Sequence, residues 1–261
     1  MSGAGAPDFF YREAQRLGYV ARSAFKLLQI QNQFKLITSG SSVLDLGCAP
    51  GAWLQVACQS LGPPRNGGSV LGIDIKKVKV PHVHCDSRVQ TVCADVMNLP
   101  KSKLKSLSPK EKGFSVILSD MCPIVSGITT RDAALSVELG MQAVNLALGE
   151  AALGVGEVIH GKDKDSIDDS TSASDCDGVL RKGGHLVLKL LESEDTQGRI
   201  LFPQLFYTWF CLPSQSSFIS EFSRMLKPLF RKSSWLRPKA TRSSSREIYL
   251  ICQSLQLQAR T

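Results

Sequence analysis

Four ionisable side chains, far apart in the sequence, are of types that could act together on a hydroxyl group. They are two lysines and two acids: Lys26, Asp120, Lys189 and Glu247. Lys189 lies inside the apolar run 185–191, where a lysine is costly unless it is paired, neutral, or reaches water from the strand end. If the four converge, burial and the second lysine lower a lysine pKa, whereas the carboxylates raise it. That balance decides whether a lysine can take a proton from an alcohol.

A second group of residues follows successive apolar segments and suits an adenosine cofactor. Residues 45–53 read DLGCAPGAW, and the two glycines allow a sharp turn and a close approach to a ligand. The G-x-x-x-G spacing disfavours NAD, because dinucleotide-binding folds use G-x-G-x-x-G. Asp74 could accept both ribose hydroxyls, and Asp95 an adenine amino group. Any one acid could simply cap a turn, but acids after three consecutive strands indicate a cofactor without a pyrophosphate, namely S-adenosylmethionine.

Alternating strands and helices predict a scaffold that brings these residues to one edge. From residue 42 the sequence predicts strands at 42–46, 69–75, 89–96, 114–120, 185–191 and 247–253. Helices are predicted over 53–60 and 131–148, and a helical region over 8–36 with Ser23 as an N-cap. This alternation is typical of an α/β fold with a mostly parallel sheet covered by helices on both faces. Ligands of such sheets bind beyond the carboxyl ends of the strands.

Two segments interrupt this pattern. Residues 154–178 carry seven acids against two lysines, are rich in serine, and have little to bury, which predicts a disordered acidic insertion. Residues 198–222 form an aromatic, apolar insertion, for which a structural helix or a partner contact is favoured over a catalytic role. The remaining sequence is read as one domain spanning 1–261.

Composition favours a polyanionic partner and gives no sign of a membrane protein. The 261 residues are 43% hydrophobic with a net charge of +8, and no apolar run approaches the ~18 residues that cross a bilayer. Basic residues cluster in two regions, which are candidate RNA-binding surfaces or solvated faces: Arg12, Arg16, Arg22 and Lys35, and Arg231, Lys232, Arg237, Lys239, Arg242 and Arg246. The eight cysteines form no C-x-x-C pair, which favours reduced thiols over a disulfide framework or a metal site.

The motifs together resemble the FtsJ-like family of ribosomal RNA 2′-O-ribose methyltransferases, in particular the large-subunit uridine enzymes of bacteria and organelles. The segments that carry the resemblance are 23–27 (SAFKL), 45–53 (DLGCAPGAW), 119–123 (SDMCP), 183–189 (GGHLVLK) and 244–249 (SSREIY). The resemblance covers roughly residues 10–150 and 178–254. It implies a Rossmann-like methyltransferase fold with a seven-stranded sheet.

The resemblance also implies roles for individual residues. The family's Lys-Asp-Lys-Glu tetrad falls on Lys26, Asp120, Lys189 and Glu247, with neutral Lys189 as the acceptor of the 2′-hydroxyl proton. The cofactor positions fall on Gly51, Trp53, Asp74, Asp95 and Asp120. Ribosomal RNA or the large ribosomal subunit is the implied partner of a monomeric enzyme. An intracellular location is expected. The resemblance alone favours a mitochondrion or chloroplast, with cytoplasm or nucleus as alternatives.

Departures from the family pattern leave other functions open. Ala52 stands where many members carry a second glycine, and the insertion 198–222 lies between Lys189 and Glu247, where it could disturb the placement of Glu247. One alternative is a methyltransferase acting on tRNA or an mRNA cap, which would share the tetrad. Another is a catalytically impaired RNA-binding factor in ribosome assembly.

Overall fold

A seven-stranded sheet forms the centre of the protein. The computed structural model describes residues 8–149, 178–193 and 218–256. The strand order in the sheet is β3-β2-β1-β4-β5-β7-β6. The strands are β1 (Ser42–Leu46), β2 (Ser69–Asp74), β3 (Val89–Cys93), β4 (Phe114–Ser119), β5 (Leu180–Leu191), β6 (Phe230–Leu236) and β7 (Glu247–Leu255).

The sheet is mostly parallel, as the sequence predicted. Strands β1 to β5 pair in parallel, whereas β7 runs antiparallel between β5 and β6. The chain proceeds from β1 outward through β2 to β3, and then returns to the other side of β1 to form β4 and β5. The strand order therefore reverses between β1 and β4, and the carboxyl ends of these two strands flank the position where α/β sheets bind ligands.

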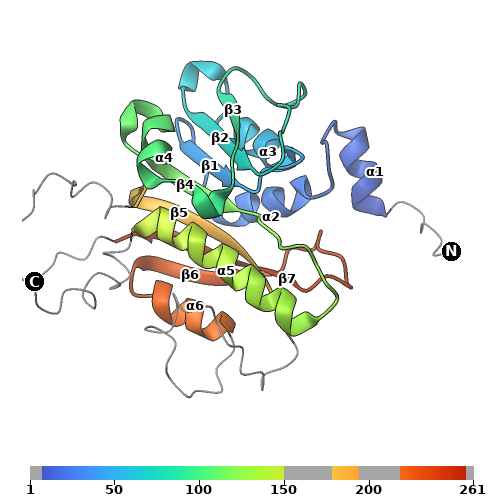
Figure 1. Cartoon of the computed structure of the whole chain (residues 1–261). Helices are drawn as coiled ribbons and strands as arrows, with labels where there is room; N and C mark the ends of the chain where they lie inside the picture. Colours follow the sequence, from blue (N-terminus) through green and yellow to red (C-terminus); the bar gives the residue numbers. More distant parts are fainter. Residues whose placement is uncertain (1–7, 150–177, 194–217, 257–261) are drawn as a thin grey trace, which may run out of the picture.

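Helices cover both faces of the sheet (Figure 1). The helices are α1 (Phe9–Arg16), α2 (Ala24–Phe34), α3 (Ala52–Ser60), α4 (Lys101–Leu107), α5 (Thr129–Leu148) and α6 (Phe218–Leu226). Residues of α2 and α3 belong to one buried cluster, and residues of α4, α5 and α6 belong to the other. Among the described residues, none of these helices combines the length and apolar character needed to span a bilayer.

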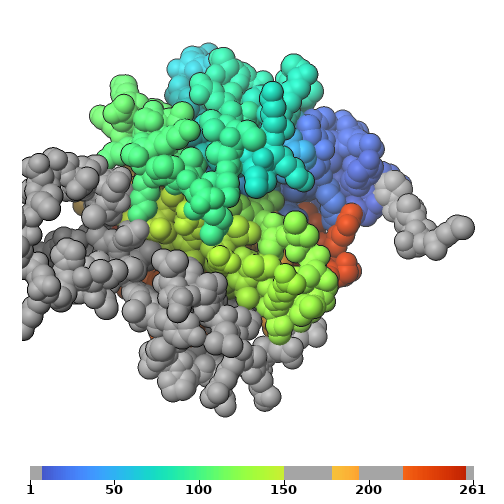
Figure 2. All heavy atoms as spheres, viewed as in Figure 1, coloured from blue at the N-terminus to red at the C-terminus, as the bar shows by residue number. Residues whose placement is uncertain are grey.

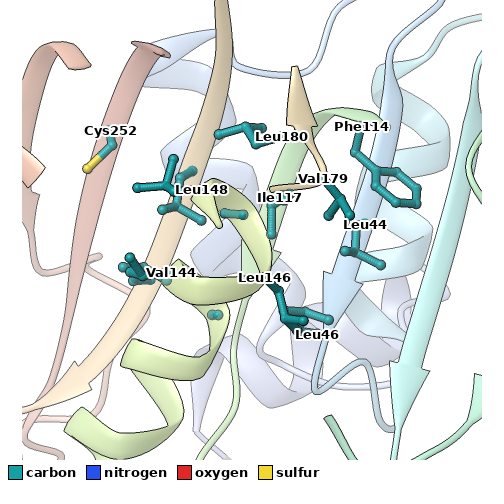
Figure 3. Close-up of a cluster of buried hydrophobic side chains, with 14 of the residues drawn as sticks. Leu44, Leu46, Phe114, Ile117, Val144, Leu146, Leu148, Val179, Leu180 and Cys252 are labelled. Atoms are coloured by element: carbon teal, nitrogen blue, oxygen red, sulfur yellow. The ribbon is translucent and has the colours of Figure 1, made fainter. Parts of the chain in front are cut away.

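Strand residues supply the two clusters alternately, because successive side chains of a strand point to opposite faces. Val43 packs with α2 and α3, whereas Leu44 and Leu46 pack with α4 and α5. Figure 3 shows Leu44 and Ile117 from the strands near Leu146 of α5. Strands buried on both faces read as continuous apolar runs, which explains why the sequence located them well.

The predicted elements needed several corrections. The helical region 8–36 is two helices, separated by a connection that contains Gly18. Gly18 has a φ of +78°, and a Cβ there would lie 2.8 Å from a methyl carbon of Val83. Ser23 does precede α2, but its side chain makes no capping hydrogen bond. The sequence did not predict β6 or α4. It favoured a structural helix for the apolar segment 198–222, and α6 begins in the last five residues of that segment.

The two predicted insertions fall largely on residues that the structure leaves undescribed. The acidic insertion 154–178 lies outside the described residues except for Gly178. The apolar insertion 198–222 lies outside them up to residue 217, and its last five residues begin α6. Phe222 of α6 is 1% exposed. It packs close to α5 because Gly140 lacks a side chain, and a Cβ there would lie 3.2 Å from Cζ of Phe222. This end of the segment is therefore part of the core.

Replacing Phe222 with alanine should lower the free energy of unfolding by about 3–5 kcal/mol, because it leaves a cavity between α5 and α6. Thermal or urea denaturation measures the change. Phe222→Leu should cost less, and Arg224→Ala, at an exposed position of the same helix, should leave stability nearly unchanged. Equal stability of Phe222→Ala and the wild type would show that α6 does not contribute to the core.

Candidate active site

The turn after β1 brings the ends of β1 and β4 close together. Gly47 has a φ of +79°, and a Cβ at this position would lie 2.9 Å from the backbone of Met121. Gly51, with a φ of +109°, precedes α3, and a Cβ there would lie 2.9 Å from Cγ of Pro81. The amide of Asp120 donates to the carbonyl oxygen of Leu46 at 3.1 Å. Only glycine allows both the conformation and the approach, so this turn places residue 120 beside it.

Asp74 is the last residue of β2, whereas Asp95 lies two residues after β3, because that strand ends at Cys93 and not at the predicted residue 96. Both acids stabilise turns. One carboxylate oxygen of Asp74 accepts from the amide of Ala49 at 2.9 Å, and the other accepts from the amide of Lys76 at 2.8 Å. Asp95 accepts from the amide of Met97 at 3.0 Å and from the side chain of Asn98 at 2.8 Å. Each acid therefore caps a turn, and Asp74 also holds the glycine turn through the amide of Ala49. A carboxylate oxygen can accept a further hydrogen bond, so these contacts leave room for a ligand hydroxyl or amino group.

Lys189 and Asp120 form one half of the predicted tetrad. Lys189 lies in β5 with 5% of its side chain exposed, and its Nζ is 3.0 Å from Oδ1 of Asp120. The same Nζ donates to the carbonyl oxygen of Asp120 at 2.5 Å. The buried lysine is therefore paired, as its position inside an apolar strand requires.

Lys26 and Glu247 form the other half. Lys26 lies in the first turn of α2, Glu247 is the first residue of β7, and the ammonium group donates to the carboxylate. Their side chains are 12% and 18% exposed. Glu247 thus contacts its predicted partner, although the whole apolar insertion separates it from Lys189 in the sequence.

The two pairs lie close enough to influence each other electrostatically. Burial lowers the pKa of Lys189, but the charges of Asp120, Cys122 and Glu247 raise it by more, so the net pKa is above the ordinary value. Lys189 is therefore an ammonium ion at neutral pH in this arrangement. The sequence hypothesis of a neutral Lys189 does not describe this resting state, because two carboxylates outweigh burial.

Tyr249 and Asp45 lie beside the tetrad residues; the sequence analysis assigned no role to Tyr249 and counted Asp45 only among the three acids at strand ends. Tyr249 is fully buried, pairs with Lys189 across the β5–β7 ladder, and donates its hydroxyl proton to Oδ1 of Asp120 at 2.8 Å. Asp45 ends up fully buried with neither carboxylate oxygen hydrogen-bonded to the described residues. Burial, followed by the charges of Asp120 and Asp74, raises the pKa of Asp45 well above its usual range. The signal for Tyr249 was its spacing of two from Glu247, which puts both on one face of a strand.

Trp53 contributes differently from the other predicted cofactor residues. Its indole is 3% exposed, donates to the carbonyl oxygen of Ser23 at 3.0 Å, and lies 5.8 Å from the ring of Tyr249. The side chain therefore anchors the start of α2, the helix that carries Lys26. Only the main chain of Trp53 remains for a ligand.

Several of the candidate RNA-binding cations instead hold the protein together. Arg22 pairs with Asp8 and donates to the carbonyl oxygen of Ala240 at 2.6 Å. Arg246 pairs with the buried carboxylate of Asp132 at 3.2 Å. Arg16 pairs with Glu13, Arg237 pairs with Glu192, and Arg242 lies 3.6 Å from Asp8. The exposed positions that remain for phosphates are Arg12, Lys35, Arg231, Lys232 and Lys239.

The chain is similar to known proteins along most of its length. The model of the FtsJ-like methyltransferase family matches residues 19–217. A Desulfosudis oleivorans protein named "Ribosomal RNA large subunit methyltransferase E" is 30% identical over 95% of this chain and 91% of its own length. A Methanocaldococcus jannaschii protein of the same name is 39% identical over 62% of this chain and 64% of its own.

A solved structure supports the fold. A Plasmodium falciparum protein described as a ribosomal RNA methyltransferase has a TM-score of 0.59 at 20% identity and covers 91% of this chain and 98% of its own. The similar curated proteins are bacterial and archaeal, so they lend no support to an organellar location. The match of the family model over most of the chain, together with a relative similar along nearly its whole length, shows that this chain belongs to the FtsJ-like methyltransferase family.

Proposed function

We propose that this protein is an S-adenosylmethionine-dependent RNA 2′-O-ribose methyltransferase that modifies a uridine of large-subunit ribosomal RNA. The observation that carries the proposal is the convergence of the Lys26–Glu247 and Lys189–Asp120 pairs beside the glycine turn. Membership of the FtsJ-like family and the names of the relatives support the reaction and the ribosomal substrate.

The acids around the turn suit a positively charged adenosine cofactor. The carboxyl group of Asp45 is buried without a hydrogen-bond donor among the described residues, and the charges of Asp74 and Asp120 act on it. An unpaired buried carboxyl group is costly, and a ligand cation nearby would offset that cost. Asp74 and Asp95 have carboxylate oxygens that can accept from ribose hydroxyls and the adenine amino group, and Gly51 supplies the left-handed backbone of the turn before α3. We therefore assign the cofactor to Gly51, Asp74, Asp95, Asp120 and the main chain of Trp53.

The tetrad residues align the ribose and remove one proton. When bound, S-adenosylmethionine supplies a methyl group on a positive sulfur, which keeps the electron pair as the ribose 2′-oxygen bonds to carbon. Lys26 and Glu247 orient the ribose hydroxyl from α2 and β7. Asp120, held by Tyr249, fixes Nζ of Lys189. After Lys189 has lost its own proton, that nitrogen accepts the proton of the 2′-hydroxyl group.

Lys189→Ala should reduce methyl transfer by at least about 10²-fold, because it removes the proton acceptor. Binding of S-adenosylmethionine, measured by calorimetry, should change little. Transfer of a labelled methyl group to RNA measures the rate. Lys182→Ala, at an exposed position of the same strand, is the matched control and should retain full activity. Near-normal turnover of Lys189→Ala would show that another group accepts the proton.

The rate of the chemical step should rise with pH. The raised pKa of Lys189 keeps it protonated at neutral pH, and the reactive neutral form increases about tenfold per pH unit below that pKa. Single-turnover rates with saturating cofactor and RNA should therefore increase from about pH 7 to pH 9. Cofactor affinity over the same range is the control. A rate independent of pH would contradict the assignment of Lys189.

The substrate is tested by presenting the purified protein with labelled S-adenosylmethionine and several RNAs. Large-subunit particles and naked large-subunit RNA should be labelled, whereas tRNA should not. Digestion to nucleosides followed by mass spectrometry should yield 2′-O-methyluridine, and mapping gives its position. Labelling of tRNA alone, or of a base rather than a ribose, would refute the proposed substrate.

A further inference from the structure

The loop between β4 and α5 exposes large aliphatic side chains directly after a tetrad residue. This loop, residues 122–128, begins two residues beyond Asp120. Ile124 is 94% exposed, and Val125 and Ile128 are each 57% exposed. Grouped apolar side chains of this size at a protein surface usually mark a binding site.

The buried carboxylate of Asp132 in α5 holds the backbone of the loop. Asp132 is fully buried in α5 and accepts from the amide of Ser126 at 2.8 Å, from its hydroxyl at 2.7 Å, and from the amide of Gly127 at 3.3 Å. Arg246, the neighbour of Glu247, donates to Asp132 and to the carbonyl oxygen of Thr129 at 3.1 Å. Figure 2 shows the green surface at the start of α5 beside the red surface of the β6–β7 connection. These contacts fix the backbone of the loop at Ser126 and Gly127, between Val125 and Ile128.

The loop begins next to the tetrad. Cys122 is at the start of the loop. Burial raises the pKa of its thiol, and the charges of all four tetrad residues also act on it. Only 5% of the Lys189 side chain is exposed. A ribose that reaches Nζ of Lys189 must therefore come into close contact with the residues around it, including the start of this loop.

A nucleotide that is stacked between its neighbours cannot approach so closely, because its ribose stays in line with those of the neighbouring nucleotides. Enzymes that must reach the base of a stacked nucleotide turn that nucleotide out of the stack. Proteins that unstack neighbouring bases often insert an apolar side chain between them. Ile124 offers such a side chain, and the exposed Arg131 after the loop suits the adjacent phosphates.

We propose that loop 122–128 is an RNA-binding wedge, in which Ile124 packs against the base left unstacked when the target ribose enters the tetrad. This inference rests on the proposed function, and it adds the nucleotides flanking the target to the surface that the enzyme recognises.

Ile124→Ser tests the wedge on a large-subunit RNA fragment containing the mapped target. On the intact fragment, kcat/KM for methyl transfer should fall about tenfold or more, because unstacking is no longer supported. On the same fragment with abasic sites flanking the target, no stacking has to be broken, and the variant should approach the wild-type rate. The fluorescence of 2-aminopurine beside the target should rise when wild-type protein binds, and less with Ile124→Ser.

Two further variants show whether the loss belongs to an aliphatic side chain at this position. Ile124→Leu retains such a side chain and should retain activity. Val83→Ser removes an exposed aliphatic side chain from the β2–β3 connection and should have no effect. The melting temperature of Ile124→Ser should equal that of the wild type, because the side chain is exposed.

The outcomes separate this inference from the proposed function. Wild-type rates for Ile124→Ser on the intact fragment, or an equal loss on both fragments, would overturn the wedge and leave the methyltransferase assignment intact. Absence of ribose methylation by the wild-type protein on every RNA would instead overturn the proposed function.

Discussion

Burying two ammonium groups close together costs a large free energy unless each is paired with a carboxylate, and the rest of the site depends on this pairing. Asp120 balances Lys189, and Glu247 balances Lys26. The parallel pairing of β4 with β5 brings Asp120, the residue after β4, to Lys189. The antiparallel pairing of β5 with β7 puts Tyr249 opposite Lys189 and Glu247 opposite Leu191. A shift of one residue in this ladder would turn Tyr249 and Glu247 to the other face of the sheet. The register of β7 therefore decides whether Glu247 can reach Lys26 of α2.

Several residues around the tetrad stabilise the fold through contacts that also position the groups of the site. Asp74 holds the turn after β1 through the amide of Ala49, and its oxygens can still accept a further hydrogen bond from a ligand. Trp53 anchors the helix of Lys26 through Ser23. Because such contacts already fix these side chains, little conformational entropy is lost when a ligand binds. Asp45 is the exception, because its carboxyl group has no donor among the described residues.

The sequence predicted the central strands and the tetrad well, and the periphery poorly. Strand β1 was predicted with its observed bounds, because buried parallel strands are continuous apolar runs between turn residues. Strand β6 was missed, since Arg231 and Lys232 at this sheet edge made it look like a basic loop. The use of Arg22 and Arg246 within the fold was also missed, because an arginine that binds a carbonyl oxygen has no distinctive sequence pattern. The protonation of Lys189 depended on the distances to Asp120 and Glu247, which no spacing along the chain reveals.

The β5–β7 ladder also explains why the length of the chain between residues 193 and 218 need not affect the site. Glu247 is positioned by hydrogen bonding of its strand to β5 and by Lys26, not by the path the chain takes to reach it. The entropy of closing a loop grows only with the logarithm of its length, so each doubling costs only about 0.6 kcal/mol. A longer or shorter connection at this point would therefore leave the Lys26–Glu247 pair in place.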